Sequence, residues 1–384
     1  MRVERVNEWS GLQALQREWN ALSAGKPLRS WDWLATWWTF YGRSEKSNRD
    51  LFVLAVYDDD ATPSNDNTIR RLVGVAPWYI EQSTLKGRVL RWLGDGEVCT
   101  DHSSFICAPE HIQLVAESLA SAVIEQFDDW DAIELDSVDS DDAAVRTLVA
   151  KLQDDGCSIN ESPADSYWAV DLPASWDEYL ANNSKSHRKQ LRQLERRVLE
   201  GDRVTWHRVQ TQDELEVAWG VLVDLHQRRR KSLGEPGCFA SQAFHDFHQQ
   251  VAEHLLLKNQ LRISWLELDG SPVAAEYHFA GSTTTYAYQG GVDPDRLADE
   301  PGRLSTILCL QQAIAEQHTR FDFLRGDEPY KAHWRATPHP TCNLRIVPAR
   351  RLARIRGRVL SIADTLQDWA RQAAELTSVG SSFV

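Results

Sequence analysis

Residues 261–291 read LRISWLELDGSPVAAEYHFAGSTTTYAYQGG, and this stretch predicts three strands in close succession. The strands lie at 261–268, 272–280 and 284–291, each rich in aromatic and β-branched side chains. Asp269-Gly270, between the first two, is typical of a tight hairpin turn. A helix predicted at 302–317 and a strand at 321–324 follow. The predicted order is therefore antiparallel hairpin, third strand, helix and strand.

The first half of the chain shows a looser version of this order. Helices are predicted at 8–22, 31–41 and 109–126, and strands at 51–57, 72–80, 89–93, 103–107 and 132–135, with a polar loop at 58–67. Two copies of one fold is the economical interpretation. The predicted fold class is α/β (α+β), with two tandem domains that each contain a mixed, mostly antiparallel sheet flanked by helices.

The breaker-rich stretch from Glu161 to Asp165 is the candidate boundary between the two copies. It predicts an N-terminal domain over residues 1–165, a C-terminal domain over 166–349, and a basic C-terminal helix within 350–384. The second domain begins with helices predicted at 176–181, 186–200, 212–231 and 241–257. A length of 384 residues suits two hydrophobic cores better than one.

The composition is that of an ordinary globular protein, with 42% hydrophobic and 26% charged residues. No apolar run approaches the roughly 20 residues that a membrane-spanning helix needs, and the N-terminus lacks the apolar stretch of a signal peptide. These features predict a cytoplasmic protein without a transmembrane segment. The net charge of -14 works against non-specific attachment to DNA, since phosphate binding depends on concentrated Lys and Arg.

The six cysteines are scattered, without a C-x-x-C pair or a Cys/His cluster at zinc-ligand spacing. They are expected to be buried free thiols, and no metal site is expected. Sixteen tryptophans are unusual in one chain, and four of them cluster at Trp31, Trp33, Trp37 and Trp38. Because large aromatic side chains bury much area, a packed helix face is favoured over a platform that stacks a ligand.

Two ionisable side chains share one face of the strand predicted at 272–280. Alternation along a strand places Glu276 and His278 on the same side, amid apolar neighbours. Such a pair is a candidate for acid–base chemistry, and exposure of both groups at the surface of the sheet is the alternative. The next strand places Tyr286 and Tyr288 on one face and ends in two glycines, which suit either a bulge or a plain turn.

Basic residues concentrate in two segments of the otherwise acidic chain. The tract from Ser184 to Arg197 has apolar residues at helical spacing, so its cations are interpreted as a solvated helix face, with a site for an anionic substrate as the alternative. The segment from His226 to Arg230 repeats this basic pattern. The helix that begins at Pro301-Gly302 presents a positive dipole end, which can bind a pyrophosphate or a carboxylate.

The segment FDFLRGDEPYK at 321–331 turns from an apolar strand into a loop dense with charges and aromatic residues. With Ala332, His333 and Trp334, it resembles the closing motif of the CelD-like (BioF-type) acetyltransferases, a branch of the GNAT superfamily related to the Fem aminoacyl transferases of peptidoglycan synthesis. The stretches at 30–38, 74–77, 184–197 and 225–229 agree, so the similarity covers nearly the whole chain.

The resemblance implies two GNAT-like domains and transfer of an acyl group from acyl-CoA, usually acetyl-CoA, to an amine or hydroxyl. It implies that Tyr288, Gln289 and Gly290 border the thioester, and that Gly302, Arg303 and Ser305 meet the phosphates of the donor. Lys331 matches a lysine in the active cleft of Fem-type enzymes, and the resemblance implies that it stabilises the tetrahedral oxyanion. The candidate acid–base residues are Glu276, His278, Asp322 and Glu328, and the candidate substrate-binding residues are Arg188, His226, Arg229, Arg325 and Tyr330.

One feature departs from the GNAT pattern. The usual Arg/Gln-x-x-Gly-x-Gly/Ala phosphate loop is replaced by Gln289-Gly290-Gly291 and, ten residues on, Pro301-Gly302. Three functions therefore remain open. The first is an acyl-CoA-dependent transferase that acts in cell-envelope or exopolysaccharide biosynthesis on a saccharide or small-molecule acceptor. The second is a Fem-like transferase that uses aminoacyl-tRNA, and the third is a non-catalytic scaffold of an envelope-synthesis complex.

Overall fold

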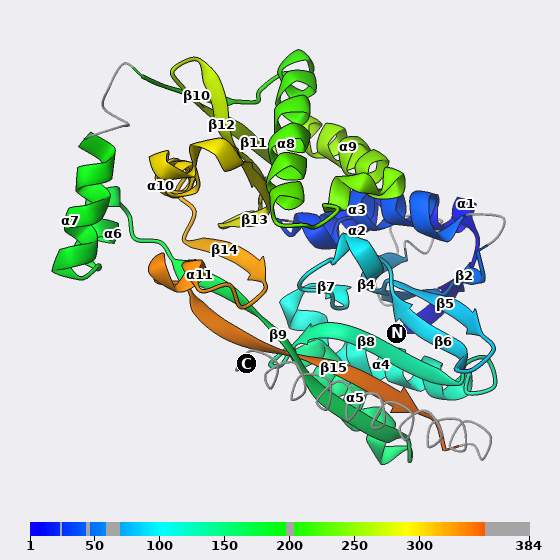
Figure 1. Cartoon of the computed structure of the whole chain (residues 1–384). Coiled ribbons are helices and arrows are strands. Elements are labelled where there is room, and N and C mark those ends of the chain that lie inside the picture. Colours follow the sequence, from blue (N-terminus) through cyan, green and yellow to red (C-terminus); the bar gives the residue numbers. More distant parts are fainter. Residues whose placement is uncertain (24, 44–46, 59–69, 197–202, 350–384) are drawn as a thin grey trace, which may run out of the picture.

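The computed structural model describes residues 1–23, 25–43, 47–58, 70–196 and 203–349 (Figure 1). The helix predicted within 350–384, most of the loop predicted at 58–67 and the end of the helix predicted at 186–200 lie outside these residues. Among the described residues, no helix is long and apolar enough to cross a membrane.

One large sheet runs through the whole molecule (Figure 1). Its strands, in spatial order, are β10 (Val204–Arg208), β11 (Leu261–Leu268), β12 (Ser271–Ala280), β13 (Thr284–Val292), β14 (Arg320–Arg325), β9 (Ser158–Asp171), β15 (Thr337–Val347), β8 (Ala132–Asp139), β6 (Gly87–Trp92), β5 (Trp78–Ser83) and β2 (Arg49–Leu51). A smaller sheet contains β1 (Arg2–Val6), β3 (Val53–Asp58), β4 (Arg71–Ala76) and β7 (Ile106–Cys107).

Helices cover both sheets. In the first half they are α1 (Trp9–Ala14), α2 (Gln16–Leu22), α3 (Trp31–Trp37), α4 (Ile112–Glu125) and α5 (Ala143–Asp154). In the second half they are α6 (Trp176–Ala181), α7 (Lys185–Leu194), α8 (Gln212–Ser232), α9 (Gln242–Leu257), α10 (Pro301–Ala315) and α11 (Tyr330–His333). A short 3₁₀ segment, η7 (Pro294–Asp299), links β13 to α10.

The two halves repeat one topology, which confirms the predicted fold class. In the first half the hairpin β5–β6 is followed by α4 and by β8, which lies parallel to β6. In the second half the hairpin β12–β13 is followed by α10 and by β14, which lies parallel to β13. All other strand pairs of the two sheets are antiparallel. Each half is therefore a mixed, mostly antiparallel unit flanked by helices.

The halves exchange strands at the centre of the large sheet. Strand β9 follows the first half in sequence but pairs with β14 of the second half. Strand β15 follows the second half but pairs with β8 of the first half, and the two exchanged strands pair with each other along nearly their whole length. The breaker-rich stretch Glu161–Asp165 is part of β9, so it is a strand and not an irregular linker. The limits of the two domains stay a prediction.

The hydrophobic core explains the tryptophan cluster. Trp33 and Trp37 are completely buried on α3, and Trp33 makes edge contacts with Phe247 of α9 and with Phe279 of β12. These aromatic contacts join the N-terminal helices to the second half of the chain. The prediction of a packed helix face is confirmed.

Some local predictions differ from the structure. The strand predicted at 72–80 is divided at Pro77, with β4 in the small sheet and β5 in the large one, because proline has no N–H for the strand ladder. The predicted buried thiols are found at Cys157, Cys309 and Cys342, whereas Cys99 is exposed. All six cysteines are free.

Candidate active site

Strand β13 contains a bulge. Its pairing with β12 shifts register, so that Tyr277 faces Gln289 and His278 faces Ala287, which leaves Tyr288 as an extra residue. A bulge interrupts the regular ladder and re-aims the backbone groups of the extra residue. The side chain of Tyr288 is held on the core side of the sheet, where its hydroxyl donates to the Val98 carbonyl at 2.6 Å.

Strands β13 and β14 separate just before this bulge. Their parallel pairing covers only Thr284–Tyr286 and Arg320–Asp322. Beyond these residues lies a cavity of about 860 Å³, which we call the β13–β14 cavity. Its walls include Ala287 to Val292 from β13 and Phe321, Phe323 and Arg325 from β14. A volume of this size suits a cofactor-sized ligand.

The N-terminus of α10 lies at this cavity. Glu300 adopts a left-handed conformation (φ 58°, ψ 45°), Pro301 begins the helix, and no side chain caps its first turn. Pro301, Gly302 and Arg303 all line the cavity. The first turn of a helix offers unpaired N–H groups and a positive dipole end, so this end of the cavity is suited to an anion.

Glu276 and His278 point into the same cavity from β12. His278 Nε2 lies 3.1 Å from Glu276 Oε2, and the Ser305 hydroxyl donates to Glu276 Oε1 at 2.5 Å. The Glu276 side chain is 16% exposed and that of His278 is 6% exposed, so the carboxylate is the more accessible of the two. The prediction that both share one face is confirmed. Ser305 itself is completely buried. It contacts Glu276 and does not line the cavity.

The two glycines of β13 permit close contacts. A Cβ atom at Gly290 would lie 2.9 Å from Glu276 Oε2, so the carboxylate rests directly on the backbone beside the bulge. A Cβ atom at Gly291 would lie 2.4 Å from the backbone nitrogen of His226, because helix α8 packs directly on the strand. Close approach, and not a turn, accounts for these glycines.

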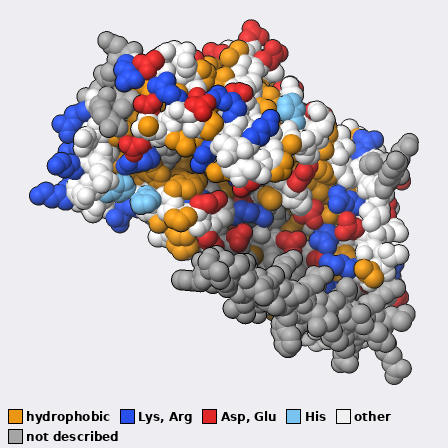
Figure 2. All heavy atoms as spheres, in the orientation of Figure 1, with side chains coloured by type: hydrophobic (Ala, Val, Ile, Leu, Met, Phe, Trp, Pro, Cys, Tyr) orange, Lys and Arg blue, Asp and Glu red, His pale blue; other side chains and the backbone are white. Residues whose placement is uncertain are grey.

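Arginine and histidine side chains border the cavity. Arg229 and Arg230 from α8, Arg303 from α10, and the imidazoles of His187 and His333 all line it. Figure 2 shows Lys, Arg and His side chains gathered over the α7 side of the molecule. Arg230, His187 and His333 were not among the predicted site residues. His226, a predicted substrate-binding residue, is 1% exposed, and burial lowers the pKa of its imidazole.

Lys331 is buried, and its ammonium group already has partners. Its Nζ donates to the carbonyl oxygens of Leu324, Arg325 and Gly326 at 3.1, 2.7 and 2.9 Å, and it lies 2.9 Å from Glu328 Oε2. These acceptors use all three donors of the ammonium group. The arrangement supports a role for Lys331 in holding the end of β14, and it does not match the expected contact with an oxyanion.

Arg325 and Tyr330 differ in whether their side chains are available to contact a substrate. The Arg325 guanidinium is bound to Asp101, and its NH2 group donates to the Thr100 carbonyl at 3.1 Å, so it joins the two halves of the chain. Tyr330 is 50% exposed at the cavity. Desolvation and the nearby carboxylates of Glu328 and Glu276 raise the pKa of its phenol.

Asp322 and Arg188 do not line the β13–β14 cavity. Arg188 neighbours the cavity residue His187 on α7, but its own side chain is not part of the wall. Asp322 projects to the opposite face of β14, because successive side chains of a strand alternate. There it lines a second cavity of about 390 Å³, which we call the junction cavity. Asp322 is therefore separated from the other predicted acid–base candidates by the sheet.

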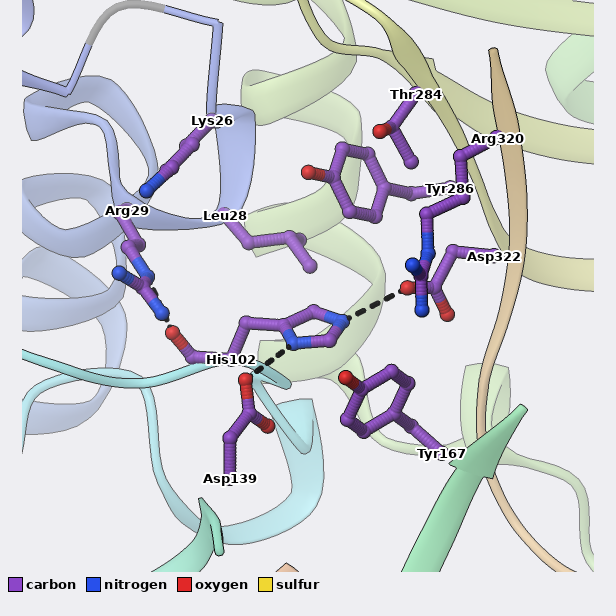
Figure 3. A pocket seen from close by; sticks show the side chains of 10 residues that line it. All are labelled: Lys26, Leu28, Arg29, His102, Asp139, Tyr167, Thr284, Tyr286, Arg320 and Asp322. Carbon is purple, nitrogen blue, oxygen red and sulfur yellow. Dashed lines mark hydrogen bonds and ion pairs between the residues drawn. The ribbon is translucent and has the colours of Figure 1, made fainter. Parts of the chain in front are cut away.

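His102 connects the two halves of the chain at the junction cavity (Figure 3). Its Nδ1 lies 3.0 Å from Asp139 Oδ2, and its Nε2 lies 3.0 Å from Asp322 Oδ2. Burial alone would lower the pKa of His102, but the charge of Asp322 and the hydrogen bonds to both carboxylates raise it to about 10. Burial would raise the pKa of Asp139, but the hydrogen bond from His102 outweighs this and lowers it. The imidazole is therefore a cation between two anions.

This arrangement makes stability depend on pH. A folded-state pKa of about 10, against an ordinary value of 6.5, means that the stabilisation is complete below pH 6.5 and is lost as the pH rises towards 10. Between these limits we expect the free energy of unfolding to fall by about 5 kcal/mol more in the unaltered protein than in His102→Gln, since each pKa unit corresponds to about 1.36 kcal/mol. Urea unfolding of both proteins across this range measures the difference, and parallel pH curves would contradict it.

A strand pair that separates at a bulge, with a helix end facing the gap, is the architecture of a GNAT-type acyltransferase domain. Residues 185–332 match the family model described as an acetyltransferase (GNAT) domain. The match extends from the start of α7 to α11 and so includes the strands and helices around the β13–β14 cavity. The resemblance to the GNAT superfamily is confirmed.

Two of the solved structures that match this chain share its fold over most of its length. The structure of FemX gives a TM-score of 0.60 at 12% sequence identity, with 90% of this chain and 97% of FemX covered. A conserved protein of unknown function from Bacteroides thetaiotaomicron gives a TM-score of 0.55 at 12% identity, with 90% and 100% covered. No curated protein matches the chain in sequence. At these identities the likeness concerns the fold alone.

Proposed function

We propose that this protein transfers an acyl group from acyl-CoA to an amine or hydroxyl, and that the reaction takes place in the β13–β14 cavity. The observation that carries the proposal is the separation of β13 and β14 at the Tyr288 bulge, beside the uncapped N-terminus of α10. This geometry leaves backbone groups of β13 facing a cavity large enough for a cofactor-sized donor.

The charges of the cavity support an anionic donor. The donor's pyrophosphate lies at Gly302, where the dipole of α10 is positive and Arg303 is adjacent. Arg229 and Arg230 of α8 add positive charge to the same wall. A Cβ atom at Gly302 would have only the Val292 side chain within 4 Å outside its own helix backbone, at 3.6 Å, so the first turn of α10 is open to a ligand.

Glu276 serves as the general base in this proposal. The acceptor nitrogen or oxygen attacks the thioester carbonyl, Glu276 takes the acceptor's proton, and the carbon–sulfur bond breaks as the new acyl bond forms. The thiolate that leaves takes up the proton from Glu276 or from solvent. The bulge at Tyr288 directs a backbone N–H towards the developing oxyanion. Hydrogen bonds of this type usually make the largest single contribution to lowering the energy barrier of acyl transfer. Lys331 is a positioning residue that fixes the end of β14.

The acceptor is proposed to be a saccharide or another small molecule of cell-envelope or exopolysaccharide biosynthesis, which follows from the CelD-like resemblance, and the proposed location is the cytoplasm. Thermal-shift titration with acetyl-CoA and with longer acyl-CoAs tests the donor. A donor at one hundred times its Kd stabilises a protein by about 2.7 kcal/mol. We expect a rise in Tm with at least one acyl-CoA, and no rise with any of them would contradict acyl-CoA as the donor.

Gly302→Ala separates donor binding from folding. The added methyl group meets only the Val292 side chain, so Tm is expected to stay within about 2 °C of the unaltered protein. The methyl group occupies the space that a phosphate needs at the helix end, so the KM for acyl-CoA is expected to rise about tenfold. Steady-state kinetics with varied acyl-CoA measure this change. An unchanged KM would exclude Gly302 from the donor site.

A Fem-like reaction with aminoacyl-tRNA is the second candidate. Its support is the likeness to FemX over both halves of the chain, together with the basic helix α7 beside the cavity. Binding of charged tRNA at low salt, weakening steeply as salt is added, would favour this donor. If Glu276→Ala and Lys331→Ala both leave the cellular phenotype intact, the third candidate, a non-catalytic scaffold, is favoured instead.

A further inference from the structure

The junction cavity lies on the other face of the strands that form the β13–β14 cavity. Arg320 and Asp322 of β14 line the junction cavity, whereas Phe321 and Phe323 line the β13–β14 cavity. Its other walls include Lys26, Arg29, His102 and Asp139 from the first half and Thr284 and Tyr286 from the second (Figure 3). Both halves therefore contribute to one polar space.

Three cations besides His102 face this space. The ammonium group of Lys26 has no hydrogen bond or ion pair with any residue that the structure describes, and its pKa is lowered mainly by the neighbouring Arg29 and also by desolvation. The Arg29 side chain donates to the His102 carbonyl and lies 3.8 Å from Asp142. Arg320 NH2 lies 3.0 Å from His339 Nε2. The Lys26 ammonium group has no ion-pair partner among the described residues, and Arg29 and Arg320 contact Asp142 and Asp171 only at 3.8 Å, so their mutual repulsion favours the binding of an anion.

The carboxylates of the junction cavity have a different role. Asp322 Oδ1 accepts from the backbone N–H of Leu324 at 2.8 Å, and its Oδ2 is bound to His102. Asp139 Oδ2 is also bound to His102, but Asp139 Oδ1 is buried and has no hydrogen-bond partner among the described residues. A buried acceptor without a partner is costly, and a hydroxyl or ammonium donor of a ligand would satisfy it.

The backbone at His102 is also constrained. His102 has a φ of 56°, which is unfavourable for a residue with a side chain. Such strain persists at sites whose surroundings fix it, and here the two carboxylates hold the ring from opposite sides. The arrangement of the cavity wall is thus fixed before any ligand enters, which reduces the cost of ordering it on binding.

We propose that the junction cavity is a second ligand site, which binds a small phosphate monoester that also carries a hydroxyl or ammonium group. Lys26, Arg29 and Arg320 hold the phosphate, and Asp139 Oδ1 accepts a hydrogen bond from the donor group. A volume of about 390 Å³ has room for a molecule the size of a sugar phosphate. The binding does not depend on the proposed acyl transfer.

Isothermal titration of the full chain with glucosamine 6-phosphate tests this site, with glucosamine and inorganic phosphate as comparison ligands. We expect glucosamine 6-phosphate to bind more tightly than either. Lys26→Gln and Arg320→Gln are each expected to raise its Kd about tenfold. The matched control is Arg229→Gln, which removes a cation from the β13–β14 cavity and is expected to leave this Kd unchanged.

Asp139→Asn tests the donor contact. It is expected to raise the Kd of glucosamine 6-phosphate about tenfold. The Kd of inorganic phosphate, which binds more weakly, is expected to stay unchanged. Lys26→Gln keeps the result interpretable if the other variants fold poorly, because its side chain has no bonding partner in the described structure. No binding of glucosamine 6-phosphate at millimolar concentration would overturn the proposal. Equal binding of inorganic phosphate, or a loss of affinity in Arg229→Gln alone, would also overturn it.

Discussion

Glu276→Gln is expected to lower kcat/KM for acyl transfer by about 10²- to 10⁴-fold, the range over which a positioned general base contributes. The amide keeps the shape of the side chain and can still accept from Ser305, but it cannot take the acceptor's proton. Glu276 is the carboxylate that lies on the β13 backbone next to the bulge, within reach of a thioester bound there. Steady-state kinetics with a competent acceptor measure the loss.

Glu328→Gln is the matched control for this prediction. Glu328 lines the same cavity, but its side chain is 57% exposed and its carboxylate is bound to Lys331. We expect its effect on kcat/KM to stay below tenfold, since its carboxylate is mostly exposed and is already bound to Lys331. The Tm of both variants shows whether they fold. A larger loss in Glu328→Gln than in Glu276→Gln would assign the base to Glu328 instead.

Gly291→Ala is expected to destabilise the protein by about 3 kcal/mol. The new methyl group would lie 2.4 Å from the backbone nitrogen of His226 and 2.8 Å from the carbonyl carbon of Leu225. These are main-chain atoms of α8, so no side-chain rotation can relieve the clash. The helix must move away from β13, and the wall that carries Arg229 and Arg230 must move with it. Urea unfolding measures the change in the free energy of unfolding.

Gly220→Ala provides the comparison for this substitution. Gly220 lies on α8 itself and is exposed, and a methyl group added there would have no atom of a neighbouring residue within 4 Å beyond its own helix backbone. Alanine in place of glycine within a helix is expected to stabilise the protein by about 0.5 to 1 kcal/mol. If both variants changed stability by the same amount, the close packing of α8 on β13 would be contradicted.

Elements with a clear local pattern were predicted accurately from the sequence. Helix α6 and strand β11 have the predicted limits, because their apolar residues follow a helical or an alternating period. Helix α5 also has such a period, at Val145, Leu148, Val149 and Leu152, but it was not predicted. The apolar period that indicates this helix was therefore present in the sequence.

The exchanged strands β9 and β15 were missed for a different reason. Both contain prolines and many exposed side chains, so neither has a regular apolar alternation. Their stability comes largely from pairing with each other and with β8 and β14, which lie far away in the sequence. Sequence patterns report local structure, and such long-range pairing leaves little local signal.

The contrast between local sequence patterns and long-range contacts also applies to the two cavities. Most predicted residues of the β13–β14 cavity come from the single segment between Glu276 and Lys331, which the strand pattern and the GNAT resemblance indicated together. The junction cavity joins His102, Asp139 and Asp322, and the first and last of these are 220 positions apart. Three partners of Lys331 are backbone carbonyls, whose positions no sequence motif reveals.

A crystal structure of the protein with acetyl-CoA bound is the most direct test of the proposed donor site. We predict electron density for the pantetheine arm between β13 and β14, with the pyrophosphate at the N-terminus of α10 and the thioester beside Tyr288. Density for the donor at any other place, with the β13–β14 cavity empty at saturating acetyl-CoA, would contradict the account.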